Sequence, residues 1–121
     1  MIFPGGMPGS KNLGECTKLI DAMNDHYQNG GSVAAICAAP KFVFGQLKGI
    51  EKAQFTCFDG CEEPLIAMRA QFLRKPAVTC GRIITGRGSG HSIDFGFAIL
   101  KQIKGEESVA KVRGGMILQV D

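Results

Sequence analysis

The sequence predicts an α/β fold in which a mostly parallel sheet carries helices on both faces. Short apolar segments alternate along the chain with segments whose apolar residues recur at helical spacing. The 17 glycines cluster between these segments, where they are typical of turns. Strands that alternate with helices favour parallel strands joined by helical crossovers, with helices covering the sheet.

In the first half of the chain, the order is strand, helix, strand, helix, strand. Residues 1–3 are the stub of an apolar strand, and the next strand, at 32–36, has the continuous small and apolar character of a strand buried on both faces. Between them, Ser10 or Asn12 can cap a helix that reaches Gly30. The apolar stripe of that helix is Leu13, Cys16, Ile20, Met23 and Tyr27. A helix at 38–47 and a strand at 53–58 follow.

The second half begins with a helix at 62–72, with Pro64 in its first turn, where proline is tolerated. Residues 77–80 and 83–85 read as a hairpin around Gly81-Arg82, and a glycine loop spans 86–90. A helix at 91–103 then places Ile93, Phe97 and Leu100 on one face. A short helix at 106–112 and an apolar tail at 114–120 complete the predicted elements.

Length and charge limit the classes of protein to consider. A chain of 121 residues fits one small domain, here 1–121. The net charge of +3, without a basic run, gives no support for nucleic-acid or membrane binding. No apolar stretch is long enough to span a bilayer and no signal peptide is visible, so we expect a cytoplasmic protein. Because Met1 resembles an internal strand residue, we also expect the domain to be incomplete, lacking its N-terminal part.

The cysteine count favours free thiols over a disulfide framework, because it is odd and no secretory signal accompanies it. Cys57 and Cys61 could pair, bind metal or fill space, but no histidine or further cysteine stands at ligand spacing, so we expect neither a metal nor a cofactor. Cys16 and Cys80 are expected to be core residues.

Cys37 is the candidate nucleophile, because it follows the buried strand at 32–36 and precedes a helix. A cysteine at a sharp strand-to-helix turn projects from the sheet into a cleft. The N-terminus of the following helix stabilises its thiolate, by about 0.3 to 1 kcal/mol in exposed settings. This strand-to-helix turn, the elbow, is by itself equally compatible with Cys37 being a small core residue after a buried strand.

Several separated segments, in order and in register, make the chain similar to the ThiJ/PfpI (DJ-1-like) superfamily. The segments are Phe3-Pro-Gly-Gly6, Asn12-Leu13, Ala34-Ala-Ile-Cys-Ala-Ala-Pro40, Thr85-Gly-Arg-Gly-Ser-Gly90 and Asp94-Phe95. The resemblance covers nearly the whole chain, as the C-terminal two-thirds of the usual family chain. It implies a flavodoxin-like three-layer sandwich that lacks its N-terminal strands and first helix, and a homodimer. It also implies a glutamate partner for the thiolate, which no residue of this chain matches.

The resemblance implies roles for further residues. The amides of Gly6 and Ala38 would form an oxyanion pocket for Cys37, with Gly5 beside them. The two places where family members carry a histidine hold Ala38 and Phe58 here, which argues against a Cys-His peptidase. Arg87 could attract an anionic or carbonyl substrate or be a solvent-exposed charge. His91 and His26 read as surface residues more readily than as general bases.

Two functions from different classes follow from this interpretation. In the first, the protein is a glyoxalase- or deglycase-type enzyme, which acts on small reactive carbonyls or glycated proteins through a hemithioacetal on Cys37. In the second, it is a redox-sensing or chaperone-like stress protein that uses oxidation of Cys37. A cysteine peptidase and an inactive fragment are the remaining alternatives.

Overall fold

The computed structural model describes residues 1–118, and its centre is a four-stranded sheet. The strand order is β1 (Ile2–Phe3), β2 (Val33–Ile36), β6 (Ile83–Gly86) and β5 (Ala77–Cys80). The first three strands are parallel and β5 is antiparallel to β6, so the expected mostly parallel sheet and the hairpin are confirmed. A separate parallel pair joins β3 (Gln54–Phe55) to β4 (Gln71–Phe72).

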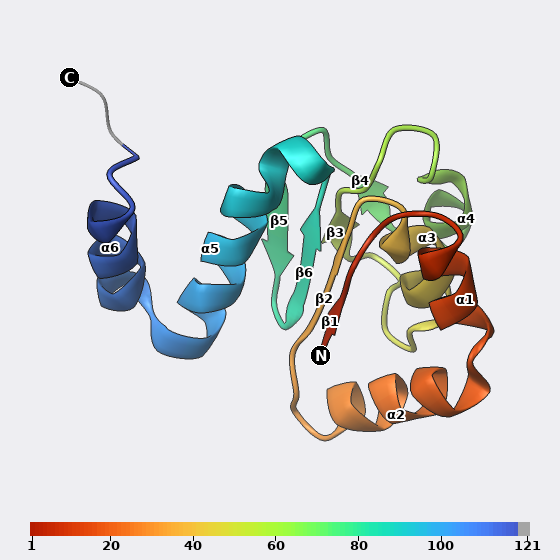
Figure 1. Ribbon diagram of the computed structural model, residues 1–121. Helices are drawn as coiled ribbons and strands as arrows, with labels where there is room; N and C mark the ends of the chain where they lie inside the picture. The colour runs from red at the N-terminus through yellow and green to blue at the C-terminus, as the bar shows by residue number, and fades with distance from the viewer. Residues whose placement is uncertain (119–121) are drawn as a thin grey trace.

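Helices cover both faces of the sheet, which gives the expected three layers (Figure 1). One face carries α5 (Ser92–Lys104), with α6 (Glu106–Gly115) packed on the far side of α5. The other face carries α1 (Gly9–Glu15), α2 (Thr17–Gln28), α3 (Ala39–Val43) and α4 (Glu63–Ala67). Two short 3₁₀ helices span Phe44–Gln46 and Ser89–His91. No helix within 1–118 is long and apolar enough to cross a bilayer.

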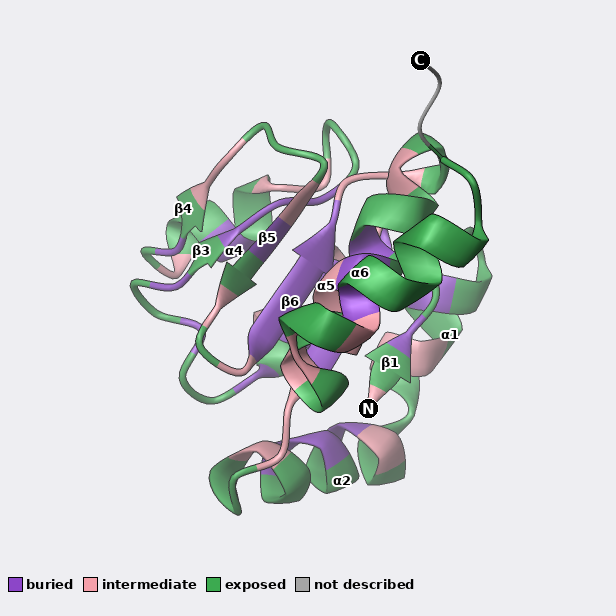
Figure 2. Cartoon of the chain, turned by 90° about the vertical axis from the view of Figure 1, so that its left-hand side faces the viewer, coloured by how far each residue is buried: buried purple, intermediate pink, exposed green. Residues whose placement is uncertain are grey.

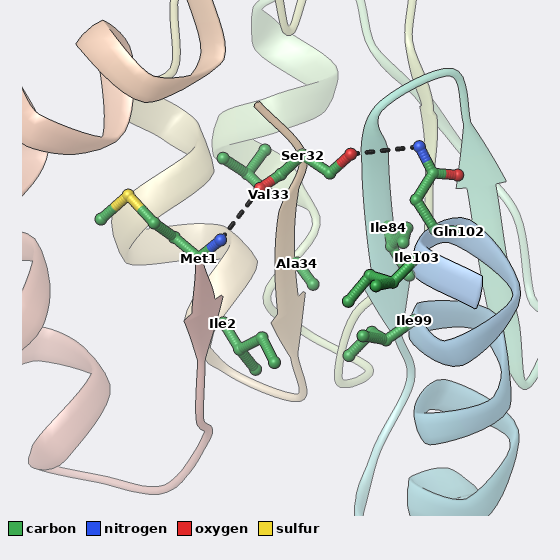
Figure 3. A pocket seen from close by; sticks show the side chains of 9 residues that line it. All are labelled: Met1, Ile2, Ser32, Val33, Ala34, Ile84, Ile99, Gln102 and Ile103. Atoms are coloured by element: carbon green, nitrogen blue, oxygen red, sulfur yellow. Dashed lines mark hydrogen bonds between the residues drawn. The ribbon is translucent and has the colours of Figure 1, made fainter. Parts of the chain in front are cut away.

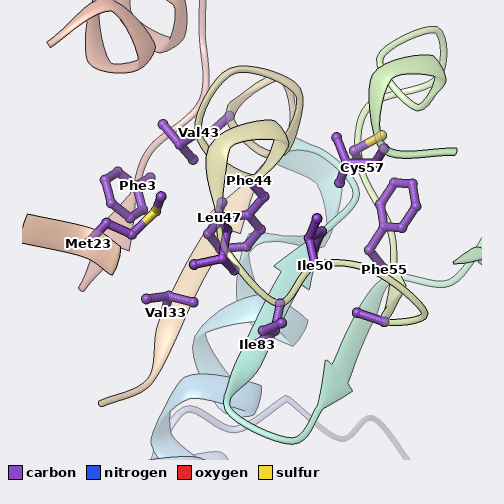
Figure 4. Packing of buried hydrophobic residues seen from close by; sticks show 14 of the residues in the cluster. Phe3, Met23, Val33, Val43, Phe44, Leu47, Ile50, Phe55, Cys57 and Ile83 are labelled. Atoms are coloured by element: carbon purple, nitrogen blue, oxygen red, sulfur yellow. The ribbon is translucent and has the colours of Figure 1, made fainter. Parts of the chain in front are cut away.

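The alternation of side chains along β2 divides the core into two parts. Val33 and Ala35 belong to the larger cluster, with Phe3, Phe44, Leu47 and Phe55 (Figure 4). Ala34 and Ile36 point the other way, toward Phe95 of α5. Both faces of β2 and β6 are covered, and β6 is buried along its length (Figure 2). The sequence pattern predicted this double burial for β2.

The helix predicted from Ser10 to Gly30 is two helices, because Cys16 interrupts it in an extended conformation at ψ 95°. Cys16 is consequently exposed, and its assignment to the core was wrong. Neither Ser10 nor Asn12 caps a helix, because the N-cap is Pro8. The buried Ser10 hydroxyl donates instead to the Pro4 carbonyl oxygen at 3.4 Å.

The predicted helix at 62–72 was also too long. It ends at Ala67, because Arg69 adopts a left-handed conformation at φ 70°. The Ala70 amide then donates to the Leu65 carbonyl oxygen and the Arg69 amide to that of Ile66, at 3.0 and 2.9 Å. This pair of bonds is a Schellman motif, which ends a helix and turns the chain toward β4.

Three smaller boundaries also differ from the prediction. The helix at 38–47 stops at Val43 and continues as a 3₁₀ turn, and the strand at 53–58 is reduced to β3. In α5, Ile93, Phe97 and Leu100 do share one face, as predicted; this face lines a groove against α6, whereas Phe95 faces the sheet. Of the predicted tail at 114–120, Gly114 and Gly115 belong to α6, and 119–120 lie outside the described residues.

Candidate functional site

Cys37 forms the turn between β2 and α3 and has a left-handed backbone at φ 65°. Such a conformation costs a residue other than glycine about 1–2 kcal/mol. Two hydrogen bonds hold it in place: the Cys37 amide donates to the Gly86 carbonyl oxygen at 2.9 Å, and the Phe58 amide donates to the Cys37 carbonyl oxygen at 2.8 Å. Hydrogen bonds to β6 and to the segment after β3 therefore fix the position of the elbow.

Small residues allow the sharp turn into α3. Ala38 and Ala39 are buried, with exposed fractions of 7% and 0%, and Pro40 lies in the first turn of the helix. A larger side chain at either alanine would meet the packed core. This explains why the sequence follows the cysteine with two alanines and a proline.

The Pro4-Gly5-Gly6 loop lies directly against the Cys37 side chain. A Cβ atom placed on Gly5 would stand 2.7 Å from the Cys37 Cβ and 3.5 Å from its Sγ. Gly6 has φ 90°, and its carbonyl oxygen accepts from the Ser10 amide at 2.9 Å. Glycine is required at both positions, at Gly5 for the close approach and at Gly6 for the left-handed backbone.

The amides of Gly6 and Ala38 are the two backbone donors that sequence reasoning assigned to the thiol. Within residues 1–118, neither donates one of the loop, cap or side-chain hydrogen bonds. Neither amide is therefore committed to the loops around it, which is what stabilising a negatively charged oxygen would require. Donors that are fixed before charge develops suit that task.

Phe58, Arg87 and His91 come together in an open pocket of about 330 Å³, which Asp59 and residues 88–90 complete. The Arg87 guanidinium pairs with the Asp59 carboxylate at 3.0 Å, so its charge is already matched. His91 lies 3.6 Å from Asp94 and is half-buried at the start of α5. His26, on α2, is exposed, and its ring contacts the Ser32 carbonyl oxygen at 3.0 Å.

A second, apolar cleft of about 100 Å³ lies between β1, β2, β6 and α5 (Figure 3). The side chains of Ile2, Ile84, Ile99 and Ile103 line it. The thiol of Cys37 is not part of this cleft. Cys37 does not line the pocket at Phe58 either, but that pocket adjoins the elbow, because the Phe58 amide donates to the Cys37 carbonyl oxygen.

All five cysteines are free, and two of them lie close to the elbow. Cys57 is fully buried, and burial, with the neighbouring Cys61 and acidic groups, raises the pKa of its thiol to about 12. Burial also raises the pKa of Cys61, although the nearby Lys41 ammonium opposes that effect. Among residues 1–118, no group of three or more His, Cys, Asp or Glu side chains could hold a metal ion.

Comparison with known proteins identifies the family of this chain. The family model described as "DJ-1/PfpI family" matches residues 1–102, which is most of the chain and includes the elbow, the Gly5-Gly6 loop and the pocket. The chain belongs to the DJ-1/PfpI family. The match ends within α5, so α6 lies outside it.

Individual DJ-1/PfpI relatives match nearly the whole chain. Protein dj-1beta of Drosophila melanogaster is 30% identical over 118 residues, and the match covers 98% of this chain and 63% of the fly protein. The Glutathione-independent glyoxalase DJR-1.2 of Caenorhabditis elegans is 29% identical over 107 residues, 56% of its length. The crystal structure of Drosophila melanogaster DJ-1beta superposes with a TM-score of 0.86 at 28% identity. The flavodoxin-like fold is thus confirmed, and the chain spans less than two thirds of these relatives.

Sequence reasoning missed three features of the site. Asp59 pairs with Arg87, the Thr85 hydroxyl accepts from the Thr56 amide at 2.8 Å, and the Ser10 hydroxyl joins α1 to the glycine loop at Pro4. All three are polar side chains whose partners come from elsewhere in the fold or sit in an irregular loop. The one available signal was that Thr56 and Thr85 interrupt apolar strands.

Proposed function

We propose that this DJ-1/PfpI family protein acts on small reactive carbonyls, such as methylglyoxal or its protein adducts, through the Cys37 thiol. The observation that carries the proposal is the contact between the glycine loop and the strained elbow. The Gly5 backbone lies against the Cys37 side chain, and the adjoining Gly6 and Ala38 amides donate none of the loop, cap or side-chain hydrogen bonds within residues 1–118. The C. elegans relative whose name records a glyoxalase supports the substrate class.

In the proposed step, the Cys37 sulfur attacks the aldehyde carbon as a thiolate. The new S–C bond forms as the carbonyl π pair moves to oxygen, and the resulting alkoxide takes a proton to give a hemithioacetal. The Gly6 and Ala38 amides would stabilise the negative oxygen while it exists. The Phe58 side chain has no ionisable proton, so it would shape the pocket without acting as an acid or base.

Competition between methylglyoxal and an alkylating agent tests the step. Iodoacetamide labelling of the 121-residue chain, followed by peptide mass spectrometry, gives the modification rate of each cysteine. We expect methylglyoxal to slow labelling of Cys37 and to leave labelling of the exposed Cys16 unchanged. Equal protection of both thiols, or of neither, would refute carbonyl addition at the elbow. Lactate formation that persists in Cys37→Ser would refute a catalytic role for the thiol.

A redox function for Cys37 is the second proposal, and the gathering of Cys57 and Cys61 near the elbow favours it. A sulfenic acid at Cys37 could use the same two amides that would serve an alkoxide. Stoichiometric peroxide distinguishes the two proposals. If the protein is a redox sensor, Cys37 is oxidised before any other thiol. Oxidation that begins at Cys16 would contradict sensing.

We also propose that the chain forms a homodimer, as the family resemblance implies, and that its setting is cytoplasmic. Light scattering coupled to size-exclusion chromatography tests the first point. A mass of 12.9 kDa at all concentrations would refute dimerisation.

A further inference from the structure

Three cysteines meet around a single backbone connection at the elbow. The Phe58 amide donates to the Cys37 carbonyl oxygen at 2.8 Å, and the Cys61 amide donates to the Phe58 carbonyl oxygen at 2.9 Å. The Cys57 thiol lies 3.4 Å from that same Phe58 oxygen. Cys57 and Cys61 thus flank the one residue that is bonded to the carbonyl of Cys37.

The two neighbours of Phe58 differ in access. Cys57 belongs to the main core and has an exposed fraction of 0% (Figure 4). Its thiol could reach Cys37 only by leaving that core. Cys61 is half-buried at the edge of the same cluster, in the turn that precedes α4. Of the two, only Cys61 combines proximity to the elbow with access to solvent.

We propose that Cys61 is the resolving thiol for Cys37, so that the pair forms a reversible disulfide after oxidation by a peroxide. The Cys37 thiolate attacks a peroxide oxygen, the O–O bond breaks, and sulfenic acid and hydroxide result. The Cys61 thiolate then attacks the Cys37 sulfur. The S–O bond breaks, hydroxide leaves and becomes water with the Cys61 proton, and an S–S bond forms. The inference shares with the proposed function only the reactivity of Cys37, not the carbonyl chemistry.

The local backbone suits this role. A disulfide needs Cα atoms about 4.4–6.8 Å apart. The turn that carries Cys61 contains Gly60 at φ 98°. The Cys61 amide donates to the Phe58 carbonyl oxygen, the Gly60 amide donates to the Glu62 carboxylate at 2.7 Å, and the exposed Asp59 carboxylate pairs with Arg87 and Arg74 at 3.0 and 3.3 Å. The proposed disulfide requires the Cys61 Cα to come within that range of the Cys37 Cα, which involves this turn at the edge of the core.

The raised pKa values of the Cys57 and Cys61 thiols limit their own reaction with peroxide. Burial raises the pKa of Cys57 and of Cys61, so both remain protonated at neutral pH and react slowly with peroxide. Lys41 partly offsets the effect of burial at Cys61 and can support the thiolate that attacks the sulfenic acid. Cys57 and Cys61 would therefore react slowly with peroxide themselves, and Cys61 would act on a sulfenic acid already formed at Cys37.

Peroxide titration of the full 121-residue chain tests the pairing, with non-reducing peptide mass spectrometry as the readout. Cys61→Ser is the test variant, and Cys80→Ser is the matched control, since Cys80 is also half-buried at the edge of the core. We expect a Cys37–Cys61 linked peptide in the unsubstituted chain and in Cys80→Ser. In Cys61→Ser the linked peptide is lost and Cys37 proceeds to sulfinic acid.

Three results would overturn the inference: Cys37 linked to Cys57, Cys37 reaching sulfinic acid without a link, or unchanged chemistry in Cys61→Ser. Oxidation in guanidinium chloride serves as the folding control. A mixture of pairings there, and a single pairing in buffer, establishes that the native structure selects Cys61. Rapid iodoacetamide labelling of Cys37 with no disulfide would refute the pairing and leave the proposed function standing. Slow labelling of Cys37 would refute both.

Discussion

Replacing Gly5 with alanine should destabilise the protein through the Cys37 elbow. The new methyl carbon would lie 2.7 Å from the Cys37 Cβ and 3.0 Å from the Ile36 carbonyl oxygen. Favourable contacts between carbon atoms begin at about 3.5–4.0 Å, so the overlap is about 1 Å. Neither neighbour can rotate away, because the Cys37 backbone is bonded to Gly86 and Phe58. The loop must move instead, at a cost of about 1–3 kcal/mol.

Urea denaturation followed by circular dichroism measures this cost. With a slope of about 2 kcal/mol per molar, a loss of about 2 kcal/mol lowers the midpoint by about 1 M. Gly96→Ala is the matched control, because a methyl group there meets no atom within 4 Å and lies inside α5. Alanine should stabilise that helix by up to about 1 kcal/mol. If Gly5→Ala is as stable as the unsubstituted chain, the contact between loop and elbow is wrong.

Two further substitutions test the elbow and the buried thiol beside it. In urea denaturation, Cys37→Gly should be more stable than Cys37→Ala by about 0.5–1 kcal/mol. Glycine relieves the strain of the left-handed backbone, and this gain outweighs the extra chain entropy that glycine loses on folding. The reverse order of stability would argue against the φ of 65°. The unfolding free energy should fall as pH rises above about 9, by at most about 1.4 kcal/mol per pH unit, because the pKa of Cys57 is raised in the folded state. Above that pH the unfolded thiol loses its proton and the buried one keeps it, so stability is complete at lower pH and is lost with increasing pH. Cys57→Ala should remove this part of the pH dependence, and an unchanged pH profile would contradict the burial of the thiol.

The elbow was predictable because its signal is local. The small and apolar run that ends in Cys37, followed by Ala38 and Pro40, prescribes a buried strand, a sharp turn and a helix start within a few residues. The hairpin of β5 and β6 was predictable for the same reason, since Gly81, at φ 60°, lies between its strands.

The breaks in helices were not predictable, because residues without a special propensity make them. Cys16 and Arg69 interrupt helical periodicity with no glycine or proline at the break. The tertiary contact of α1 with α3 needs Gly14 against the Phe42 carbonyl oxygen, where a methyl group would stand at 2.6 Å. A sequence pattern read one segment at a time does not contain that information.

Contacts between side chains that are far apart in the sequence were equally unpredictable. Asp59 and Arg87 are 28 residues apart, and only the fold brings the carboxylate to the guanidinium. The sequence left Arg87 either as a charge that attracts a substrate or as a solvent-exposed loop charge, whereas the structure pairs it with Asp59. The gathering of Cys57 and Cys61 beside Cys37 likewise depends on the segment after β3 returning to the elbow.

Cys37 is proposed as the reactive thiol of this DJ-1/PfpI family chain, and competitive alkylation tests that proposal most directly. All five cysteines are free, and Cys16 is the exposed one, so access to solvent alone would make Cys16 react first. A limiting amount of iodoacetamide at neutral pH, followed by peptide mass spectrometry, ranks the five thiols in one experiment. We expect Cys37 to be labelled first and Cys57 to be labelled last. Labelling of Cys16 ahead of Cys37 would contradict it.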